Sequence, residues 1–360
     1  MLKVQEFLRQ NSNNIIKLQQ DYGVECIFND NDGRVIFNYS QINSPKKEDM
    51  VRECRGLVLD RYNNWELVAR SFTRFFNWNE YPEDTQHFNW NDCVINTKED
   101  GSLILLYYYN GSWHINTRGS FGNGKVNDSQ YTWRTLFEST MSNVNITALP
   151  HYTYVLELCS PYNAVVRAYS EPCSFLLSVF DGYLELPWEE VKALSKRHCF
   201  NHVDQHHFTN VDEVNEYLSN KSHSDPTFEG VVLRDNKSRF KIKSIKYVEL
   251  HKIHNNGNIA SPKNLINFIL DGEEAELLSY FPMLTTTVNE MKTVLNQEFI
   301  ALLKVWEESK DIFNQKDFAL YVLQHTRLHS LLFQARKTGE ELKNIWAKSG
   351  KMLVEYLFKE

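Results

Sequence analysis

The sequence has little that would hold a fold together by disulfide bonds or place it in a membrane. Its six cysteines include no C-x-x-C pair, and a chain of 360 residues does not need disulfides to fold. No apolar run approaches the ~18 residues of a membrane helix. The most apolar stretch, residues 103–109, has the length of a strand, and the N-terminus lacks a signal-like apolar segment. We therefore expect reduced thiols and a soluble cytoplasmic protein without a membrane partner.

The chain also lacks an excess of positive charge. Its formal net charge is -7 and its pI is near 6.0, whereas a protein that coats duplex nucleic acid nonspecifically carries excess cations. Any nucleic-acid site must therefore be a local basic groove on an acidic protein. The sequence contains no G-x-x-x-x-G-K-[ST] loop, so nothing supports a P-loop ATPase or a kinase.

Short β-branched and aromatic runs dominate the chain from about residue 35 to residue 243. They are bounded by Gly, Asn, Asp and Pro, which is typical of antiparallel strands. Residues 187–196 and 211–218 interrupt them with helical patterns, so this part is predicted to be an α+β domain. The expected strands include residues 57–59, 103–109, 113–116, 154–158, 175–180, 231–233 and 239–243.

After about residue 252 the strand-like alternation nearly vanishes and long amphipathic segments replace it. One stripe at helical spacing consists of Val288, Met291, Leu295, Phe299, Leu302 and Trp306. We expect this stripe to be helix core rather than a platform on which RNA bases stack. The sequence therefore predicts an antiparallel-sheet domain at residues 1–252 and an all-α domain at residues 253–360, with a connector at residues 254–263.

The segment T-K-E-D-G-S at residues 97–102 is the most informative one for chemistry. Glycine allows the backbone to approach a phosphate closely, and polar neighbours can fix the amine of Lys98. To act as a nucleophile this amine must lose its proton, which nearby cations or removal from water favour. The alternative is an ordinary surface turn, because K-x-D-G is a short motif.

A pair of lysines marks a second candidate, R-F-K-I-K at residues 239–243. Side chains alternate along a strand, so Lys241 and Lys243 share one face while Phe240 and Ile242 share the other. Two neighbouring cations suit a polyphosphate and would help an adjacent lysine to lose its proton. The alternative is a solvated edge strand whose lysines prevent aggregation.

Two acidic residues lie in apolar strand contexts, Glu157 in V-L-E-L and Glu229 in F-E-G-V. Such carboxylates are costly unless they meet a metal, a cation or a sugar hydroxyl, and a structural salt bridge is the competing explanation. Arg55, in E-C-R-G-L-V-L, stands at the start of an expected strand and can bind phosphate through two hydrogen bonds.

These chemically active residues follow one another in the order Lys98, Glu157, Glu229-Gly230, Lys241 and Lys243. The joint pattern resembles the covalent nucleotidyltransferase superfamily of ligases and capping enzymes. More narrowly, the chain is similar to the phage-type ATP-dependent RNA ligase 1 family, strongly over roughly residues 35–250 and weakly over the helical remainder. The segments that carry this resemblance are residues 53–59, 71–80, 97–103, 117–120, 157–161 and 239–244.

The resemblance implies ATP and Mg²⁺ as cofactors, with Mn²⁺ as a possible substitute for Mg²⁺. The Lys98 amine would attack the α-phosphorus of ATP and become N6-AMP-lysine. Lys241 and Lys243 would hold the ATP phosphates. Glu229 would lie close to Lys98 and the metal, and Glu157 would contact the ribose, or the metal through water.

Four further positions follow from the same resemblance. Arg55 would bind ribose or phosphate, and Tyr39 would contribute to the nucleotide site or the end-binding site. Arg74 and Arg118 stand where the family tends to carry lysines, which keeps the charge but changes the geometry. An aromatic residue between positions 175 and 180 would stack on adenine, and alternation does not identify which one.

The substrates implied are RNA 5′-phosphate and 3′-hydroxyl ends, including those of broken tRNA, after a separate polynucleotide kinase/phosphatase has healed them. We expect a monomer, in the host cytoplasm if a bacteriophage encodes it. The rivals are a DNA ligase or an mRNA capping guanylyltransferase, which usually carry a strand-rich OB domain after the last lysine motif. A noncatalytic RNA-end-binding protein is a further alternative, which the presence of Lys98 with both acids and both distal lysines disfavours.

Residues 198–207 contain four histidines and Cys199, enough to consider a zinc site. Their spacing matches no standard zinc pattern, and the segment directly follows an expected helix. We therefore expect a polar surface loop there.

Overall fold

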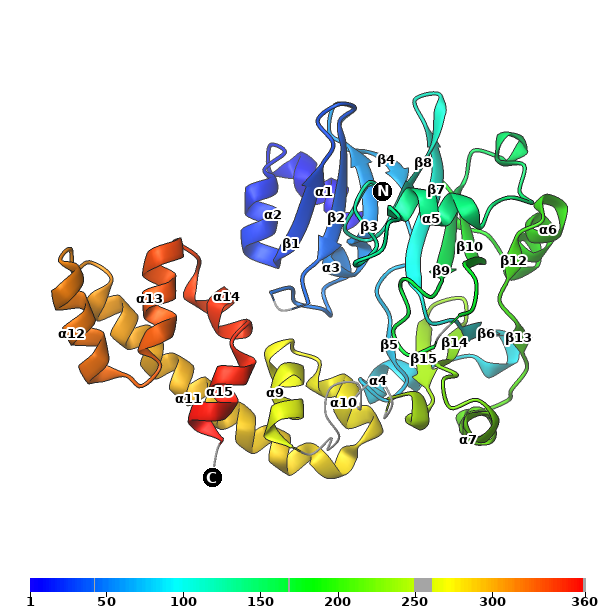
Figure 1. The fold of residues 1–360 in the computed structure, drawn as a ribbon. Coiled ribbons are helices and arrows are strands. Elements are labelled where there is room, and N and C mark those ends of the chain that lie inside the picture. The colour runs from blue at the N-terminus through cyan, green and yellow to red at the C-terminus, as the bar shows by residue number, and fades with distance from the viewer. Residues whose placement is uncertain (42, 168, 249–260, 359–360) are drawn as a thin grey trace. The chain divides into compact units, whose positions relative to one another are not determined.

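The structure, a computed structural model, describes residues 1–41, 43–167, 169–248 and 261–358 (Figure 1). The chain divides into two compact units, Met1–His251 and Lys252–Glu360. Within the described residues, the first unit combines three sheets with helices, and the second contains helices alone. The predicted α+β class, with antiparallel sheets followed by a helical C-terminal region, is confirmed.

The first sheet contains four antiparallel strands near the N-terminus. In spatial order they are β1 (Val24–Phe28), β2 (Arg34–Tyr39), β3 (Arg55–Asp60) and β4 (Glu66–Ala69). The helices of this region are α1 (Lys3–Gln10), α2 (Ile15–Tyr22) and α3 (Asp49–Glu53). Because side chains alternate along β2, Val35 and Phe37 pack with these helices while Ile36 packs against the second sheet.

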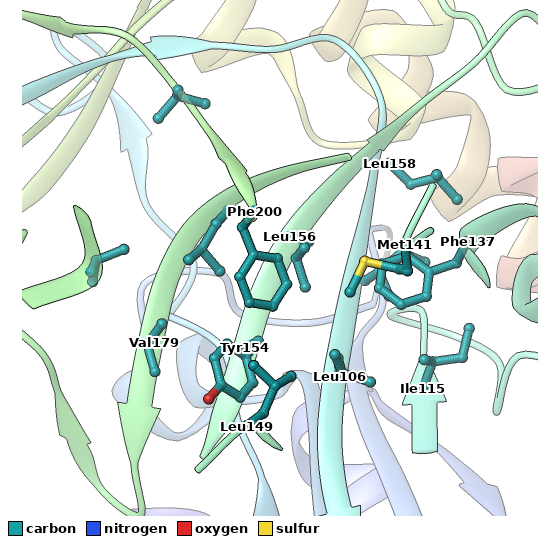
Figure 2. Packing of buried hydrophobic residues seen from close by; sticks show 14 of the residues in the cluster. Leu106, Ile115, Phe137, Met141, Leu149, Tyr154, Leu156, Leu158, Val179 and Phe200 are labelled. Atoms are coloured by element: carbon teal, nitrogen blue, oxygen red, sulfur yellow. The ribbon is translucent and has the colours of Figure 1, made fainter. Parts of the chain in front are cut away.

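The second sheet contains the three longest strands of the described residues. In spatial order its strands are β11 (Leu184–Glu185), β10 (Cys173–Asp181), β9 (Thr153–Cys159), β7 (Ser102–Tyr109) and β8 (Ser112–Asn116), and β12 (Asn201–His202) pairs in parallel with β10. Helices α5 (Trp133–Ser139) and α6 (Trp188–His198) share its core. Figure 2 shows this core, where Tyr154 stacks on Phe200 with ring centroids 5.5 Å apart.

The third sheet carries most of the sequence-predicted chemistry. In spatial order its strands are β13 (Gln205–His206), β6 (Val94–Lys98), β14 (Gly230–Arg234), β15 (Arg239–Lys243) and β5 (Phe76–Asn77), the last parallel to β15. Helix α7 (Val211–Ser224) buries Val214 and Leu218 against Ile95 and Val231. The face of the third sheet that packs against α7 is therefore apolar, and the opposite face is available for polar side chains.

Short helices connect these strands, and longer ones form the second unit. The connections contain α4 (Pro82–Thr85) and the 3-10 turns η1 (Trp90–Asp92) and η2 (Ile146–Ala148). The second unit contains α9 (Pro262–Leu270), α10 (Glu274–Tyr280), η3 (Pro282–Leu284), α11 (Thr285–Ser309), α12 (Gln315–His325), α13 (His329–Thr338), α14 (Leu342–Ala347) and α15 (Gly350–Leu357). The predicted apolar stripe lies on α11: Val288, Met291, Leu295 and Leu302 are buried, and Phe299 packs against Trp346.

The strands expected from the sequence are all present, and most extend beyond the predicted ends. The prediction of a surface loop at residues 198–207 is wrong, because this segment contributes β12 and β13 to the edges of two sheets. The connector expected at residues 254–263 lies outside the described residues as far as residue 260, and its last two residues belong to α9. In the part of the chain that the structure describes, no helix is long and apolar enough to cross a membrane.

Candidate active site

Lys98 is the last residue of β6 and lies on the face of the third sheet opposite α7. The antiparallel register pairs Lys98 with Gly230 of β14, and Gly230 with Lys243 of β15. Lys98 and Lys243 therefore share one face. Glu229 joins them: its Oε2 accepts a hydrogen bond from Lys98 Nζ at 2.8 Å, and its Oε1 lies 3.4 Å from Lys243 Nζ.

Glu229 is the most enclosed member of this group, with only 5% of its surface exposed. A carboxylate removed from water to this degree needs both cations, and in return it fixes where their ammonium groups lie. The neighbouring Gly230 makes the arrangement possible. Its φ is +151°, and a Cβ there would lie 2.1 Å from the carbonyl oxygen of Ile242, so the strands approach more closely than any side chain would allow.

A second row of residues, polar except for Val232, runs parallel to the first. The register aligns Asn96, Val232, Lys241 and Asn77 across β6, β14, β15 and β5. Lys241 thus shares the face of Lys98, and Phe240 and Ile242 are buried on the other, as alternation predicts. The Nδ2 group of Asn96 is buried and finds no hydrogen-bond partner among the described residues. A buried donor of this kind is costly unless a ligand completes it.

Glu157 comes to the same place from the second sheet, where it pairs with Leu103 of β7. Burial raises the pKa of Glu157 to about 7; Lys98 and Arg55 oppose this rise, and Glu229 adds to it. Glu157 of the second sheet is therefore in electrostatic contact with Lys98 and Glu229 of the third. We call Lys98, Glu157, Glu229 and Lys243 the lysine–acid region.

The donor set of the lysine–acid region fits a hard divalent cation. Mg²⁺ is usually held by one or two carboxylates together with substrate phosphates and water, and Glu157 and Glu229 supply two carboxylates. No group of three or more His, Cys, Asp and Glu side chains arranged for a metal occurs within the described ranges. A metal here would therefore depend on oxygen atoms that a substrate brings.

Asp100 anchors the loop that follows β9 to the turn that carries Lys98. Its Oδ2 accepts hydrogen bonds from the backbone N–H groups of Val166 at 2.9 Å and Arg167 at 2.8 Å. Next to it, a Cβ on Gly101 would lie 2.4 Å from the carbonyl oxygen of Leu158, so glycine is required where the turn meets β9. The sequence pattern does not indicate that Asp100 anchors this loop, because its partners lie more than 60 residues away along the chain.

Arg55, Arg74 and Arg118 converge on Tyr39 at the end of β2. The guanidinium carbon of Arg118 lies 4.6 Å from the centroid of the Tyr39 ring, and that of Arg74 lies 4.9 Å from it. Burial alone would raise the pKa of Tyr39, but Arg118, Arg55 and Arg74 outweigh it and lower the pKa to about 8. We call these four residues the arginine–tyrosine region.

The arginine–tyrosine region has more cationic donors than acceptors. Burial lowers the pKa of Arg55 to about 10, although Tyr39 and Glu157 act in the opposite direction. Nη1 of Arg55 and Nε of Arg74 are buried and have no hydrogen-bond partner among the described residues. Buried N–H donors in excess of acceptors fit an anionic group such as a phosphate. Arg55 also links the two regions, since its charge acts on both Tyr39 and Glu157.

The aromatic residues at positions 175 and 180 have different surroundings. Phe180 is 2% exposed and belongs to the core between the first and second sheets. Phe175 pairs with Glu157 in the register of β9 and β10. Of these two rings, Phe175 is the one beside a predicted site residue.

The chain is similar to known proteins in sequence and in fold. The sequence profile of a family described as RNA ligase matches residues 53–247, which include every predicted site residue except Tyr39. A protein of Autographa californica nuclear polyhedrosis virus, named for polynucleotide kinase and RNA ligase activities, is 28% identical over 279 residues. An RNA ligase of Rhodothermus phage RM378 is 29% identical over 177 residues.

The matches cover 71% and 38% of this chain, respectively, and the chain spans only 38% and 40% of those two relatives. Among solved structures, an archaeal ATP-dependent RNA ligase aligns with a TM-score of 0.50 at 13% identity. That alignment covers 91% of this chain and 80% of the archaeal one, and it shows similarity of fold.

Proposed function

The chain belongs to the RNA ligase family whose profile spans residues 53–247, as its motifs predict, and from this membership we propose that it is an ATP-dependent RNA ligase. The observation that carries the proposal is the position of Lys98. Its amine is held 2.8 Å from the buried Glu229, which also lies 3.4 Å from Lys243. A lysine fixed among a cation and two acids suits attack on a nucleotide phosphate.

In the first step, the Lys98 amine attacks the α-phosphorus of ATP in line and pyrophosphate leaves. The product is a lysyl-AMP phosphoramidate. Glu229 orients the amine before attack, and Lys243 and Lys241, on the same face, neutralise charge on the leaving phosphates. Phosphoryl transfer of this kind depends mainly on positioning and charge neutralisation, which these residues supply.

In the next two steps, AMP passes from Lys98 to the 5′-phosphate of an RNA end, and a 3′-hydroxyl then displaces it. The bond from Lys98 to phosphorus breaks, a 5′-5′ pyrophosphate forms, and the final attack makes the phosphodiester and releases AMP. The unpaired donors of Arg55 and Arg74 suit a phosphate that has to be held during these transfers. We propose that the arginine–tyrosine region binds it.

Glu157 and Glu229 would hold Mg²⁺, for which Mn²⁺ could substitute, and the ion would contribute charge neutralisation at the phosphates. Binding of the ion would depend on the protonation state of Glu157. The pKa of Glu157 is raised to about 7 by burial, so its carboxylate is fully available only above that pH.

The helical second unit favours RNA ligase over a DNA ligase or a capping guanylyltransferase. Residues 261–358 form helices and no strands, whereas a strand-rich OB domain is usual in those rivals. A noncatalytic RNA-end-binding protein would have no need to keep Lys98, Glu229 and Lys243 in contact.

The proposed substrates are RNA 5′-phosphate and 3′-hydroxyl ends, with broken tRNA as the physiological case, and the protein would act as a monomer. The name of the viral relative includes a polynucleotide kinase. This supports a pathway in which a separate kinase/phosphatase prepares the ends that this chain seals.

The test is to incubate the protein with α-labelled ATP or GTP and Mg²⁺, denature it, and measure retained label. We expect retention from ATP alone, followed by sealing of single-stranded 5′-phosphate RNA but not of nicked duplex DNA. Retention from GTP would indicate a capping enzyme, sealing of nicked DNA a DNA ligase, and no retention a binding protein.

A further inference from the structure

The loop between β9 and β10 exposes apolar side chains where a loop would ordinarily be polar. Residues 161–165, P-Y-N-A-V, contain no charge. Tyr162 is 38% exposed and Val165 is 46% exposed, and Pro161 and Ala164 are exposed as well. Four exposed apolar residues within five consecutive positions are a candidate contact surface, because such side chains are usually scattered singly. We call Pro161, Tyr162, Ala164 and Val165 the apolar rim.

Hydrogen bonds of Asn163 connect the apolar rim to the turn that follows Lys98. Asn163, in its centre, is 5% exposed. Its Nδ2 donates to Ser102 Oγ at 3.0 Å and to the carbonyl oxygen of Leu158 at 2.7 Å, while its Oδ1 accepts from Ser160 Oγ at 2.5 Å. Together with the hydrogen bonds that Asp100 accepts from Val166 and Arg167, these contacts fix the rim to the turn that follows Lys98.

Tyr162 is also held from the side. Its ring packs on that of Tyr131, with centroids 4.9 Å apart and planes tilted by 50°. Asn127 Nδ2 donates to the Tyr162 carbonyl oxygen at 2.7 Å. The ring is therefore ordered before any ligand binds, which lowers the entropic cost of stacking against it.

Given the proposed function, on which this inference rests, we propose that the apolar rim binds the terminal nucleobase of a single-stranded RNA end by stacking on Tyr162. Unpaired bases present flat apolar faces that stack on aromatic side chains. A phosphate group would need cations, and the four rim residues carry none. The cations of the candidate site lie in the lysine–acid and arginine–tyrosine regions, so the rim is better suited to a base than to a phosphate. The ring is exposed, which suits an RNA strand that must bind and dissociate. It suits ATP less well, because ATP has to be enclosed for reaction.

The test compares Tyr162→Ala and Tyr162→Phe with Tyr62→Ala, a control at an exposed tyrosine of the first unit. Each variant is assayed for lysyl-AMP formation from ATP, and for sealing of pre-adenylated RNA to an acceptor RNA, with each strand varied in turn. A stacked base is worth roughly 1–3 kcal/mol, which is about 5- to 140-fold in binding at about 1.4 kcal/mol per factor of ten. We expect Tyr162→Ala to raise KM for one strand about tenfold, with lysyl-AMP formation unchanged, and Tyr162→Phe and Tyr62→Ala to resemble the wild type.

RNA with an abasic terminal residue identifies the strand and the contact. If the base stacks on Tyr162, removing it from that strand raises KM in the wild type and has no further effect in Tyr162→Ala. The inference would be overturned if Tyr162→Ala left the KM for both strands unchanged. It would also be overturned if Tyr162→Ala raised KM relative to the wild type equally for intact and abasic RNA. Slower lysyl-AMP formation in Tyr162→Ala would overturn it too, by placing the rim in the ATP site. Absence of lysyl-AMP in the wild type would instead overturn the proposed function.

Discussion

The two halves of the candidate site handle charge in opposite ways. In the lysine–acid region, the two carboxylates of Glu157 and Glu229 equal the two lysines in number, and Glu229 lies 2.8 Å and 3.4 Å from the two ammonium groups. In the arginine–tyrosine region, three guanidinium groups surround one phenol, and two of their N–H donors have no partner among the described residues. The first region has as many acids as lysines, whereas the second would be completed by an anion.

This difference predicts a division of labour. A balanced cluster of buried charges holds a nucleophile in one position, so changes there should lower the rate of the chemical step. An unbalanced cluster of donors binds an anion, so changes there should lower affinity. Variants in the two regions should therefore separate kcat from KM.

Replacement of the nucleophile should have the largest effect. Lys98→Arg keeps the positive charge beside Glu229, but a guanidinium stays protonated and cannot attack phosphorus. We expect lysyl-AMP formation to fall to background while ATP binding, measured by calorimetry, changes only a few-fold. A covalent adduct in this variant would show that another residue carries the AMP.

Loss of the bridging carboxylate should come next. Glu229→Gln leaves Lys98 and Lys243 without their shared counter-charge, and we expect about a 100-fold slower adenylation at saturating ATP. Glu185→Gln is the matched control, because Glu185 Oε1 likewise accepts from two cations, Arg234 and Arg239, both at 2.5 Å. We expect the control to lower Tm and to leave the adenylation rate within a few-fold. Equal losses of rate would mean that Glu229 is only structural.

The arginine–tyrosine region should respond in affinity. Arg74→Ala removes one charge-assisted donor group, and we expect about a tenfold higher KM for ATP or for the RNA 5′-phosphate end, with kcat little changed. Arg118→Lys, which keeps the positive charge but loses the planar guanidinium, should raise KM less. If Arg74→Ala lowered kcat alone, the proposed division between the regions would be wrong.

The two regions should also give the pH profile two limbs, with smaller effects. The pKa of Glu157 is raised to about 7, so its carboxylate form, and with it the adenylation rate, increases as the pH rises through 7. The pKa of Tyr39 is lowered to about 8, so above pH 8 a tyrosinate competes with the phosphate for the arginines and KM rises a few-fold.

The free energy of unfolding should also depend on the protonation of Tyr39 and Glu157, whose pKa values are shifted in opposite directions. For Tyr39 the folded pKa is depressed, so folding gains stability as the pH rises from 8 towards 10 and has none of that gain below 8. For Glu157 the folded pKa is raised, so its contribution is present below pH 4.5 and is lost as the pH rises through 7. Tyr39→Phe should abolish the alkaline limb in both denaturation and KM profiles. Persistence of that limb would assign it to another group.

The sequence predicted much of this fold because alternation and helical spacing are local signals. Phe240 and Ile242 turn inward and Lys241 and Lys243 outward as the two-residue period requires. The segment at residues 198–207 shows no strand pattern, because β12 and β13 pair only two residues each, too few for a period to appear. Its His206 bonds the hydroxyl of Thr97 through a ring nitrogen at 2.8 Å, a contact that no local pattern indicates.

The geometry of the site depended on contacts between distant segments. The order of Lys98, Glu157 and Glu229 along the chain predicted that they act together, but only the fold shows that one carboxylate bridges two lysines. The convergence of three arginines on Tyr39 was likewise hidden, because these residues come from separate segments of the first unit. Sequence predicts which residue types take part, and tertiary packing determines which charges are paired.

The central claim is that Lys98 becomes covalently adenylated. It is tested most directly by incubating the wild-type protein with ATP and Mg²⁺, digesting it, and locating the adduct by mass spectrometry. The account predicts a mass gain of one AMP on the peptide that contains Lys98, sensitive to acid as a phosphoramidate is, and removed when 5′-phosphate RNA is added. AMP on another residue, or no covalent AMP in a folded protein, would contradict it.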